Sequence, residues 1–168
     1  LSVSHLTGVT PRSEKNVTMF MAESYIGSKL CYPGDLVINT MWAWMGALGV
    51  SKYQGIVSPS YGVYCINRKD LIDDAYLGSL LRTTPYITKY NQVSTGLHSS
   101  RLRLYPHLFL NIEVLLPPLD EQKAIVAHLE AYEEQHRAVV DATKRESELL
   151  KEYKQTLIAS AVTGQIRV

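Results

Sequence analysis

The fold is decided by residues 116–164, LPPLDEQKAIVAHLEAYEEQHRAVVDATKRESELLKEYKQTLIASAVTG. Pro117 and Pro118 end the structure that precedes them, and no further proline or glycine occurs before Gly164, which suits a helix C-terminus. Steps of four and three residues from Ile125 pass through eleven positions, and seven of these are apolar or aromatic. These seven predict a helix-pairing interface made of Ile125, Leu129, Tyr132, Val139, Leu150, Tyr153 and Leu157. A helix of roughly 65 Å cannot bury such a stripe alone, so we expect it to pair with another helix.

The residues before the prolines have the mixed pattern of an α+β globule. Short apolar and β-branched runs predict strands at residues 36–40, 56–57, 61–66, 101–105 and 112–116. Asp73 or Asp74 suits the start of a helix that reaches about Arg82, and Pro85 suits the first turn of a second helix at residues 86–92. The predicted fold class is therefore α+β (mixed α/β), a globule followed by one long helix.

Composition and cysteine usage restrict the class of protein. The 168 residues are 46% apolar and 20% charged, and no apolar run approaches the roughly 18 residues of a membrane-spanning helix. Cys31 and Cys65 give neither a disulfide framework nor metal-ligand spacing. We therefore expect a core-forming protein of the reduced cytoplasm. The chain begins at Leu1 rather than methionine, so we expect it to be part of a longer product.

The net charge of +1 conceals a separation of charge along the chain. Residues 1–119 carry ten Lys/Arg and seven Asp/Glu, whereas residues 120–163 carry six and nine. No acid occurs in residues 37–68 or 76–111. Acid-free stretches with scattered cations suit a surface for a polyanion, and chance variation in a nearly neutral chain explains them equally well.

Groups for covalent chemistry are missing from the sequence. It contains no GxxxxGK[ST] phosphate loop, no GxGxxG fingerprint and no Asn-Pro-Pro-Tyr or Asp-Pro-Pro-Tyr segment of the amino-methyltransferase kind. The five histidines lack metal-ligand spacing. Asp70, Asp73 and Asp74 form a carboxylate cluster, but their place at a predicted helix start favours helix capping over catalysis. We therefore predict no catalytic residue, no metal site and no cofactor of this chain's own.

Four segments resemble the specificity subunits of type I restriction–modification systems. Pro117-Pro118-Leu119-Asp120-Glu121-Gln122 resembles the LPPLxEQ motif that opens the spacer helix of that family, and residues 157–166, LIASAVTGQI, resemble its closing ALI-x-x-AVTGKI motif. Residues 33–39, PGDLVIN, begin with a predicted turn and are similar to the PGDIVFN segment of its target-recognition domains. Residues 55–61, GIVSPSY, are similar to its GIVSPAY segment. In this order, with the helix attached, the four motifs are specific.

The resemblance implies a DNA-reading subunit without a catalytic site. In that family, two recognition domains each bind one half of a split double-stranded DNA target, and two long helices pack antiparallel between them as a coiled coil. Modification (methyltransferase) subunits dock on the helices and methylate adenine with S-adenosylmethionine, and a separate ATP-driven restriction subunit acts on unmodified DNA. S-adenosylmethionine and ATP/Mg are accordingly expected in partner subunits only.

The chain departs from the family in copy number. A full specificity subunit has two domain-plus-helix repeats, whereas this sequence has one and lacks the first few tens of residues of a recognition domain. We expect residues 1–116 to form a DNA target-recognition domain with an incomplete N-terminus, and residues 117–168 to form a spacer and dimerisation helix with a C-terminal tail. The chain is then either part of a longer subunit or a half-subunit that forms a homodimer.

The first candidate DNA contact is the loop or irregular hairpin expected at residues 41–54. Lys52, Tyr53 and Gln54 are polar or cationic residues on a stretch interrupted by glycines, and they suit contacts to phosphates or base edges. Trp42 and Trp44 lie on the same stretch, part of which we expect to face the DNA. We favour the interpretation of this pair as core aromatics over a place on the DNA-facing part of the loop.

The second candidate is the acid-free stretch at residues 89–103. Its amides, hydroxyls and cations suit phosphates and base edges, and a solvated surface loop explains them nearly as well. The predicted contacts are Lys89, Asn91, Gln92, Ser94, Thr95, His98, Ser99, Arg101 and Arg103. Replacing Lys89 or Arg101 by alanine is expected to weaken DNA binding and to reduce its salt dependence by about one charge.

Two other functions stay open on the sequence. One is the recognition portion of a fused restriction–methylation enzyme, which a methyltransferase motif upstream of Leu1 would favour. The other is an interaction protein that oligomerises through the long helix and binds no DNA. Salt-insensitive or absent binding to duplex DNA would favour the second alternative.

Overall fold

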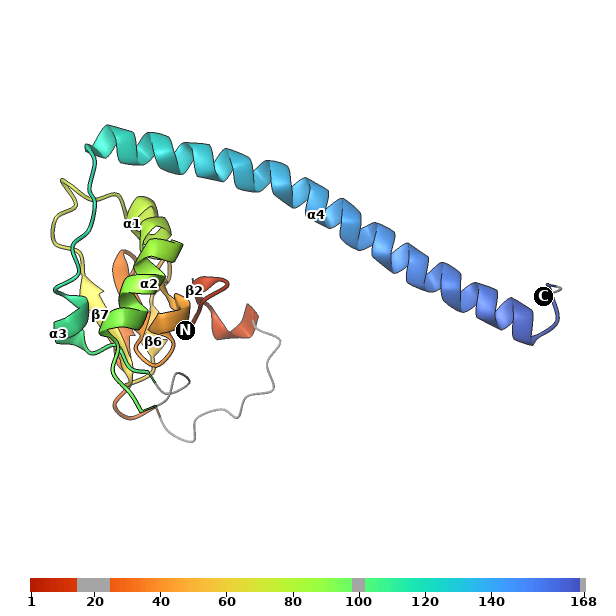
Figure 1. The fold of residues 1–168 in the computed structure, drawn as a ribbon, viewed down its shortest axis with the longest axis horizontal. Coiled ribbons are helices and arrows are strands. Elements are labelled where there is room, and N and C mark those ends of the chain that lie inside the picture. Colours follow the sequence, from red (N-terminus) through yellow and green to blue (C-terminus); the bar gives the residue numbers. More distant parts are fainter. Residues whose placement is uncertain (15–24, 98–101, 167–168) are drawn as a thin grey trace. The chain divides into compact units, whose positions relative to one another are not determined.

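The computed structural model describes residues 1–14, 25–97 and 102–166 (Figure 1). Its internal contacts divide the chain into a first unit, Leu1–Ala124, and a second unit, Ile125–Val168. The described strands and short helices all belong to the first unit, which opens with a β-hairpin and the 3₁₀ helix η1 (Arg12–Glu14). The domain boundary predicted between residues 116 and 117 stays a prediction.

The described strands form three small antiparallel sheets. β1 (Ser2–Ser4) pairs with β2 (Gly8–Thr10), and β3 (Lys29–Cys31) pairs with β6 (Gly55–Val57). The third sheet has the order β5-β4-β7, in which the strands are Leu48–Val50, Asp35–Asn39 and Tyr61–Cys65. The strands predicted at residues 36–40, 56–57 and 61–66 are confirmed to within one residue at each end.

Both faces of β4 are buried, which makes it the central strand of the unit. Leu36 and Ile38 pack in one core cluster with helical residues. Val37 packs in a second cluster with residues of β1, β2, β3 and β6. Successive side chains of a strand point to opposite faces, so an uninterrupted apolar run fits a strand between two cores.

The turn before β4 requires a glycine. Gly34 has a φ of +89°, and a Cβ at this position would lie 2.8 Å from Lys69 Nζ. The Gly34 N–H donates to Ser51 O at 2.8 Å, which ties the start of β4 to the chain that leaves β5. The turn predicted at Pro33-Gly34-Asp35 is confirmed.

Two short helices, α1 (Asp74–Leu80) and α2 (Thr84–Val93), close the first core cluster. The Asp73 side chain accepts a hydrogen bond from Tyr76 N at 2.9 Å and caps α1, and Pro85 lies in the first turn of α2, as predicted. Tyr90 is fully buried and donates from Oη to Leu81 O at 2.8 Å. Burial raises the pKa of Tyr90, so its hydroxyl remains a donor.

The strand predicted at residues 112–116 is wrong. The chain there has no strand geometry, and it lies between the short helix α3 (Pro106–Phe109) and the prolines. Leu115 N–H donates to Tyr86 Oη at 3.1 Å, and Tyr76 Oη donates to Leu115 O at 3.2 Å. Tyrosine hydroxyls of α1 and α2 therefore satisfy both backbone groups of Leu115 without a neighbouring strand.

The strand predicted at residues 101–105 is also wrong in its described part. Among the described residues of this segment, the one β-type backbone pairing is an isolated bridge between Arg103 and Thr95. Leu104 N–H donates to Thr40 O at 2.9 Å instead of continuing the pairing, and Tyr105 begins the turn into α3.

The long helix is confirmed as one uninterrupted element, α4 (Leu119–Val162). It is followed by Gly164, which has a φ of +70°. Small antiparallel sheets, short helices and this long helix together confirm the predicted α+β class. No helix among the described residues has both the length and the apolarity to span a membrane.

Candidate nucleic-acid interface

The candidate site begins where β4 ends, at two buried polar residues. Asn39 Nδ2 donates to Tyr61 Oη at 3.1 Å, and Thr40 Oγ1 donates to Ser60 O at 2.7 Å. Burial raises the pKa of Tyr61, so its hydroxyl stays neutral and accepts the bond from Asn39. These bonds fix the point at which the chain leaves the sheet and reaches Met41.

The 3₁₀ helix η2 (Ala43–Met45) and the residues before it form one wall of the site. Trp44 Nε1 donates to Met41 O at 3.0 Å, and the Trp42 and Trp44 rings stack with their centroids 6.3 Å apart. Met41 is 37% exposed and Trp42 is 49% exposed. The interpretation of Trp42 as a core aromatic is therefore wrong, whereas Trp44 is half-buried.

The opposite wall comes from the chain after α2. Thr95 and Arg103 exchange two backbone hydrogen bonds, of 3.0 and 2.9 Å, which draw residues 95 and 103 together. The bond from Leu104 N to Thr40 O ties this wall to the end of β4. Asn91 Nδ2 donates to Trp44 O at 2.8 Å and to Ile87 O at 2.9 Å, and it thus joins α2 to the first wall.

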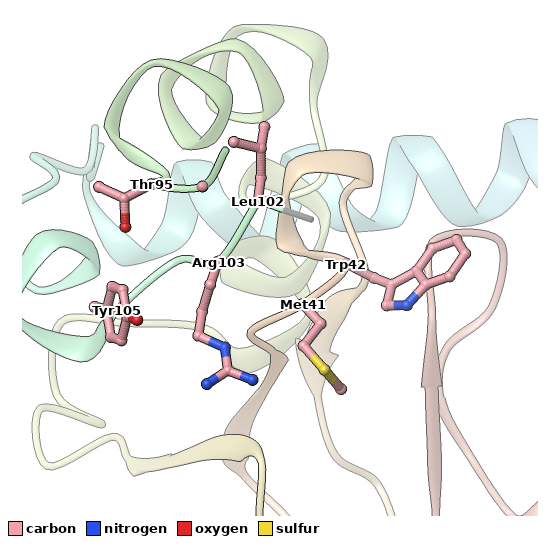
Figure 2. A pocket seen from close by; sticks show the side chains of 7 residues that line it. Met41, Trp42, Thr95, Leu102, Arg103 and Tyr105 are labelled. Carbon is pink, nitrogen blue, oxygen red and sulfur yellow. The ribbon is translucent and has the colours of Figure 1, made fainter. Parts of the chain in front are cut away.

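The two walls enclose an open groove of about 500 Å³. It is lined by Met41, Trp42, Thr95, Gly96, Leu102, Arg103 and Tyr105. Figure 2 shows the guanidinium of Arg103 between the side chains of Tyr105 and Met41. Among the described residues, the lining contains one cation and no acid, and four of its side chains are apolar or aromatic. Such a surface suits an electron-rich, partly apolar ligand such as the edge of a nucleic-acid base.

The structure brings part of the second predicted stretch into this groove. Thr95 and Arg103 line it. Lys89 and Gln92 are exposed on α2 but do not line it, and Ser94 is half-buried as the C-cap of α2. His98, Ser99 and Arg101 lie outside the described residues.

The three contacts predicted in the first stretch lie elsewhere on the unit, whereas Met41 and Trp42 of the same stretch line the groove. Lys52, Tyr53 and Gln54 are exposed, but they follow Ser51, whose N–H donates to Asp35 O at the start of β4. Met41 follows the other end of β4, and a five-residue strand separates its ends by about 15 Å. The contacts predicted in the first stretch and those predicted in the second therefore do not form one continuous site.

Sequence reasoning missed most of the groove. Met41 and Trp42 belong to the first candidate stretch, and Gly96 and Leu102 to the second, but none of them was named as a contact, and neither was Tyr105. The one signal available was the position of Met41 and Trp42 directly after a buried strand, since side chains that follow strand ends often line sites.

The predicted helix-pairing residues lie on α4 and are all exposed in the single chain. Their exposed fractions run from 37% for Ile125 to 63% for Val139 and Tyr153. Two of the polar positions on the stripe have partners within the helix. The His136 and Tyr132 rings lie with centroids 4.1 Å apart, and Thr143 Oγ1 donates to Val139 O at 2.9 Å. The pairing itself stays a prediction.

The carboxylates and histidines do not form a metal centre in the part of the chain that the structure describes, where no group of three or more potential ligands gathers. The carboxylate cluster near α1 is divided between structural partners. Asp73 caps the helix, Asp74 pairs with Lys69 at 2.5 Å, and Asp70 pairs with Arg68 at 2.9 Å. The hydrogen bond from Arg68 holds the pKa of Asp70 below its usual range.

A family model and two curated proteins similar to this chain all describe type I restriction specificity proteins. Residues 23–147 match the family model described as type I restriction modification DNA specificity domain. The chain is 28% identical over 141 residues to the type I restriction enzyme EcoKI specificity subunit of Escherichia coli K12, and equally to the StySPI specificity subunit of Salmonella potsdam. Each match covers 80% of this chain and 29% of the relative, so the chain spans under a third of these curated relatives.

A solved structure supports the fold. The HsdS subunit from Thermoanaerobacter tengcongensis is similar with a TM-score of 0.61 and 24% sequence identity, over 82% of this chain and 36% of that one. This likeness concerns the fold alone. The family model, which matches more than half of the sequence, shows that the chain belongs to the type I restriction–modification DNA specificity domain family.

Proposed function

We propose that this chain is a non-catalytic, DNA-reading part of a type I restriction–modification specificity subunit. The observation that carries the proposal is the groove at the end of β4, where two separate segments meet around Arg103 and the described lining residues include no acid. Family membership adds the expectation of a duplex DNA ligand. The groove belongs to one compact unit, so we propose that the chain reads one half of a bipartite target.

The assembly part of the proposal rests on the exposed stripe of α4. An apolar stripe on a long helix favours packing against another helix, either of a second repeat or of a second copy. We propose that modification subunits and a restriction subunit join this scaffold in the cytoplasm. S-adenosylmethionine and ATP/Mg then belong to those partners, and this chain supplies binding alone.

A salt titration of duplex DNA binding tests the proposal. A fluorescent random-sequence duplex is titrated with the 168-residue chain at several salt concentrations. We expect log Kobs to fall linearly with log salt, because Lys and Arg displace counterions from phosphates. Absence of binding at low salt, or binding insensitive to salt, would instead favour an interaction protein.

The variant Lys89→Ala sharpens this test. Lys89 is exposed on α2, with its Nζ 5.0 Å from the centre of the Tyr86 ring, and it has no acidic partner among the described residues. If it contacts a phosphate, its loss lowers the magnitude of the salt slope by about 0.9. Lys144→Ala, an exposed lysine of α4, is the matched control and should leave the slope unchanged. Equal slopes for Lys89→Ala and the wild type would remove Lys89 from the interface.

A further inference from the structure

The backbone of Arg103 is held on both sides, unlike that of a typical surface arginine. Two hydrogen bonds join Arg103 to Thr95, and the next residue, Leu104, is 1% exposed and bonded to Thr40 O. The Cα of Arg103 therefore has a fixed place at the groove. A side chain on a fixed backbone loses less freedom when it binds, which favours directional recognition over a loose ionic contact.

The guanidinium of Arg103 also differs from those of two other arginines in the first unit. Arg68 is paired with Asp70, and Arg82 Nη2 donates to the carbonyls of His5 at 2.8 Å and Leu6 at 2.7 Å. Arg103 makes no side-chain hydrogen bond or ion pair with any described residue. Its donors are therefore available to a ligand in the groove.

The surroundings of Arg103 favour a base over a phosphate. Met41, Trp42, Leu102 and Tyr105 line the same groove, and apart from the indole N–H and the phenol they offer apolar surface (Figure 2). A phosphate gains nothing from such walls, since it needs several donors. Base edges can use both the guanidinium and the apolar walls, because guanine offers two acceptors to one guanidinium and thymine offers a methyl group to an apolar wall.

We propose that Arg103 is a specificity-determining residue that donates two hydrogen bonds to O6 and N7 of a guanine in the DNA major groove. Met41 and Trp42 pack against the base pair beside that guanine. The proposal rests on the DNA-reading function proposed above and adds the residue and the base that it reads. It excludes a role for Arg103 as a phosphate contact.

The test begins with the duplexes that the wild-type chain selects from a random library. The affinity of the best duplex is then compared with those of all its single base-pair substitutions, for the wild type, Arg103→Ala, Arg103→Lys and the control Arg68→Ala. For the wild type, we expect replacement of one particular G·C pair to cost about 10- to 100-fold in affinity. In Arg103→Ala that preference disappears, while preferences at the other positions and the salt slope stay as they were.

The lysine variant separates bidentate recognition from charge. A lysine keeps the positive charge but not the rigid fork of two donors, so we expect Arg103→Lys to lose most of the preference at that G·C pair. Arg68→Ala removes an arginine already paired with Asp70 and should keep the full preference. Circular dichroism spectra that match the wild type show that each variant is folded.

Three outcomes would overturn the inference. If Arg103→Ala weakens binding to every duplex by one factor and lowers the salt slope by about 0.9, Arg103 contacts a phosphate. If Arg103→Ala keeps every wild-type preference, Arg103 reads no base, and the DNA-reading function stands without it. If the wild-type chain itself selects no sequence, the proposed function fails first.

Discussion

Gln122 is the clearest case of a single side chain whose bonds decide a local structure. It is 0% exposed in the first turn of α4, where its Oε1 accepts Asp73 N–H at 2.9 Å. Its Nε2 donates to Leu71 O at 2.8 Å and to Pro117 O at 2.7 Å. All three partners lie in the first unit, so the last residue of the LPPLxEQ-like motif works as a structural clamp.

We expect Gln122→Met to destabilise the first unit by about 2 kcal/mol, because methionine fills the same space but leaves the three backbone groups without this partner. Urea unfolding followed by tryptophan fluorescence measures the change, since both tryptophans of the chain, Trp42 and Trp44, belong to this unit. Gln135→Met, at an exposed position of α4, is the matched control and should shift the unfolding free energy by less than about 0.5 kcal/mol. Equal effects of the two variants would contradict the clamp.

At the same scale, the sequence identifies only the polar part of the groove. Thr95 and Arg103 could be predicted because cations and hydroxyls in an acid-free stretch indicate a polyanion surface. Trp42 and Tyr105 could not, because an aromatic residue packs equally well in a core or beside a ligand. Two hydrogen bonds decide which of the two places these aromatic residues take. One runs from Leu104 N to Thr40 O, and the other runs from Asn91 Nδ2 to Trp44 O. Both join segments far apart in the sequence.

At the scale of the element, signals that act within a few residues predict the local structure correctly. The turn at Gly34, the cap at Asp73 and the proline in the first turn of α2 all lie where the residue types require them. The errors fall where the partner is remote. Residues 112–116 have strand-like composition, but hydroxyls of Tyr76 and Tyr86 take the place of a neighbouring strand.

The start of α1 yields a prediction about that element. Asp73→Ala removes the acceptor of the Tyr76 N–H and should lower the free energy of unfolding of the first unit by about 1 kcal/mol. Asp73→Asn keeps a side-chain oxygen at the same place and should stay close to the wild type in the same urea experiment. If the asparagine variant loses as much as the alanine variant, the charge of Asp73 matters and the capping bond does not.

At the scale of the whole molecule, the two units present different surfaces. The first has a groove around Arg103 with no acid among the described lining residues, and the second has a helix with an exposed apolar stripe. A cation in such a groove attracts a polyanion, whereas an exposed apolar stripe favours contacts with protein, so the first unit suits DNA binding and the second suits protein assembly. This division follows from charge and exposure within each unit and needs no particular arrangement of the two.

The stripe gives the last prediction, which concerns the assembly state. Because Leu150, Tyr153 and Leu157 are 61%, 63% and 41% exposed, we expect the isolated chain to self-associate as its concentration rises. Leu150→Asp places a charge within the exposed stripe and should shift the mass measured by light scattering towards that of a monomer. Gln155→Asp introduces the same charge on another face of α4 and should leave the mass unchanged. A wild-type chain that stays monomeric at all concentrations would contradict self-pairing, and equal effects of the two aspartates would assign the change to charge rather than to the stripe.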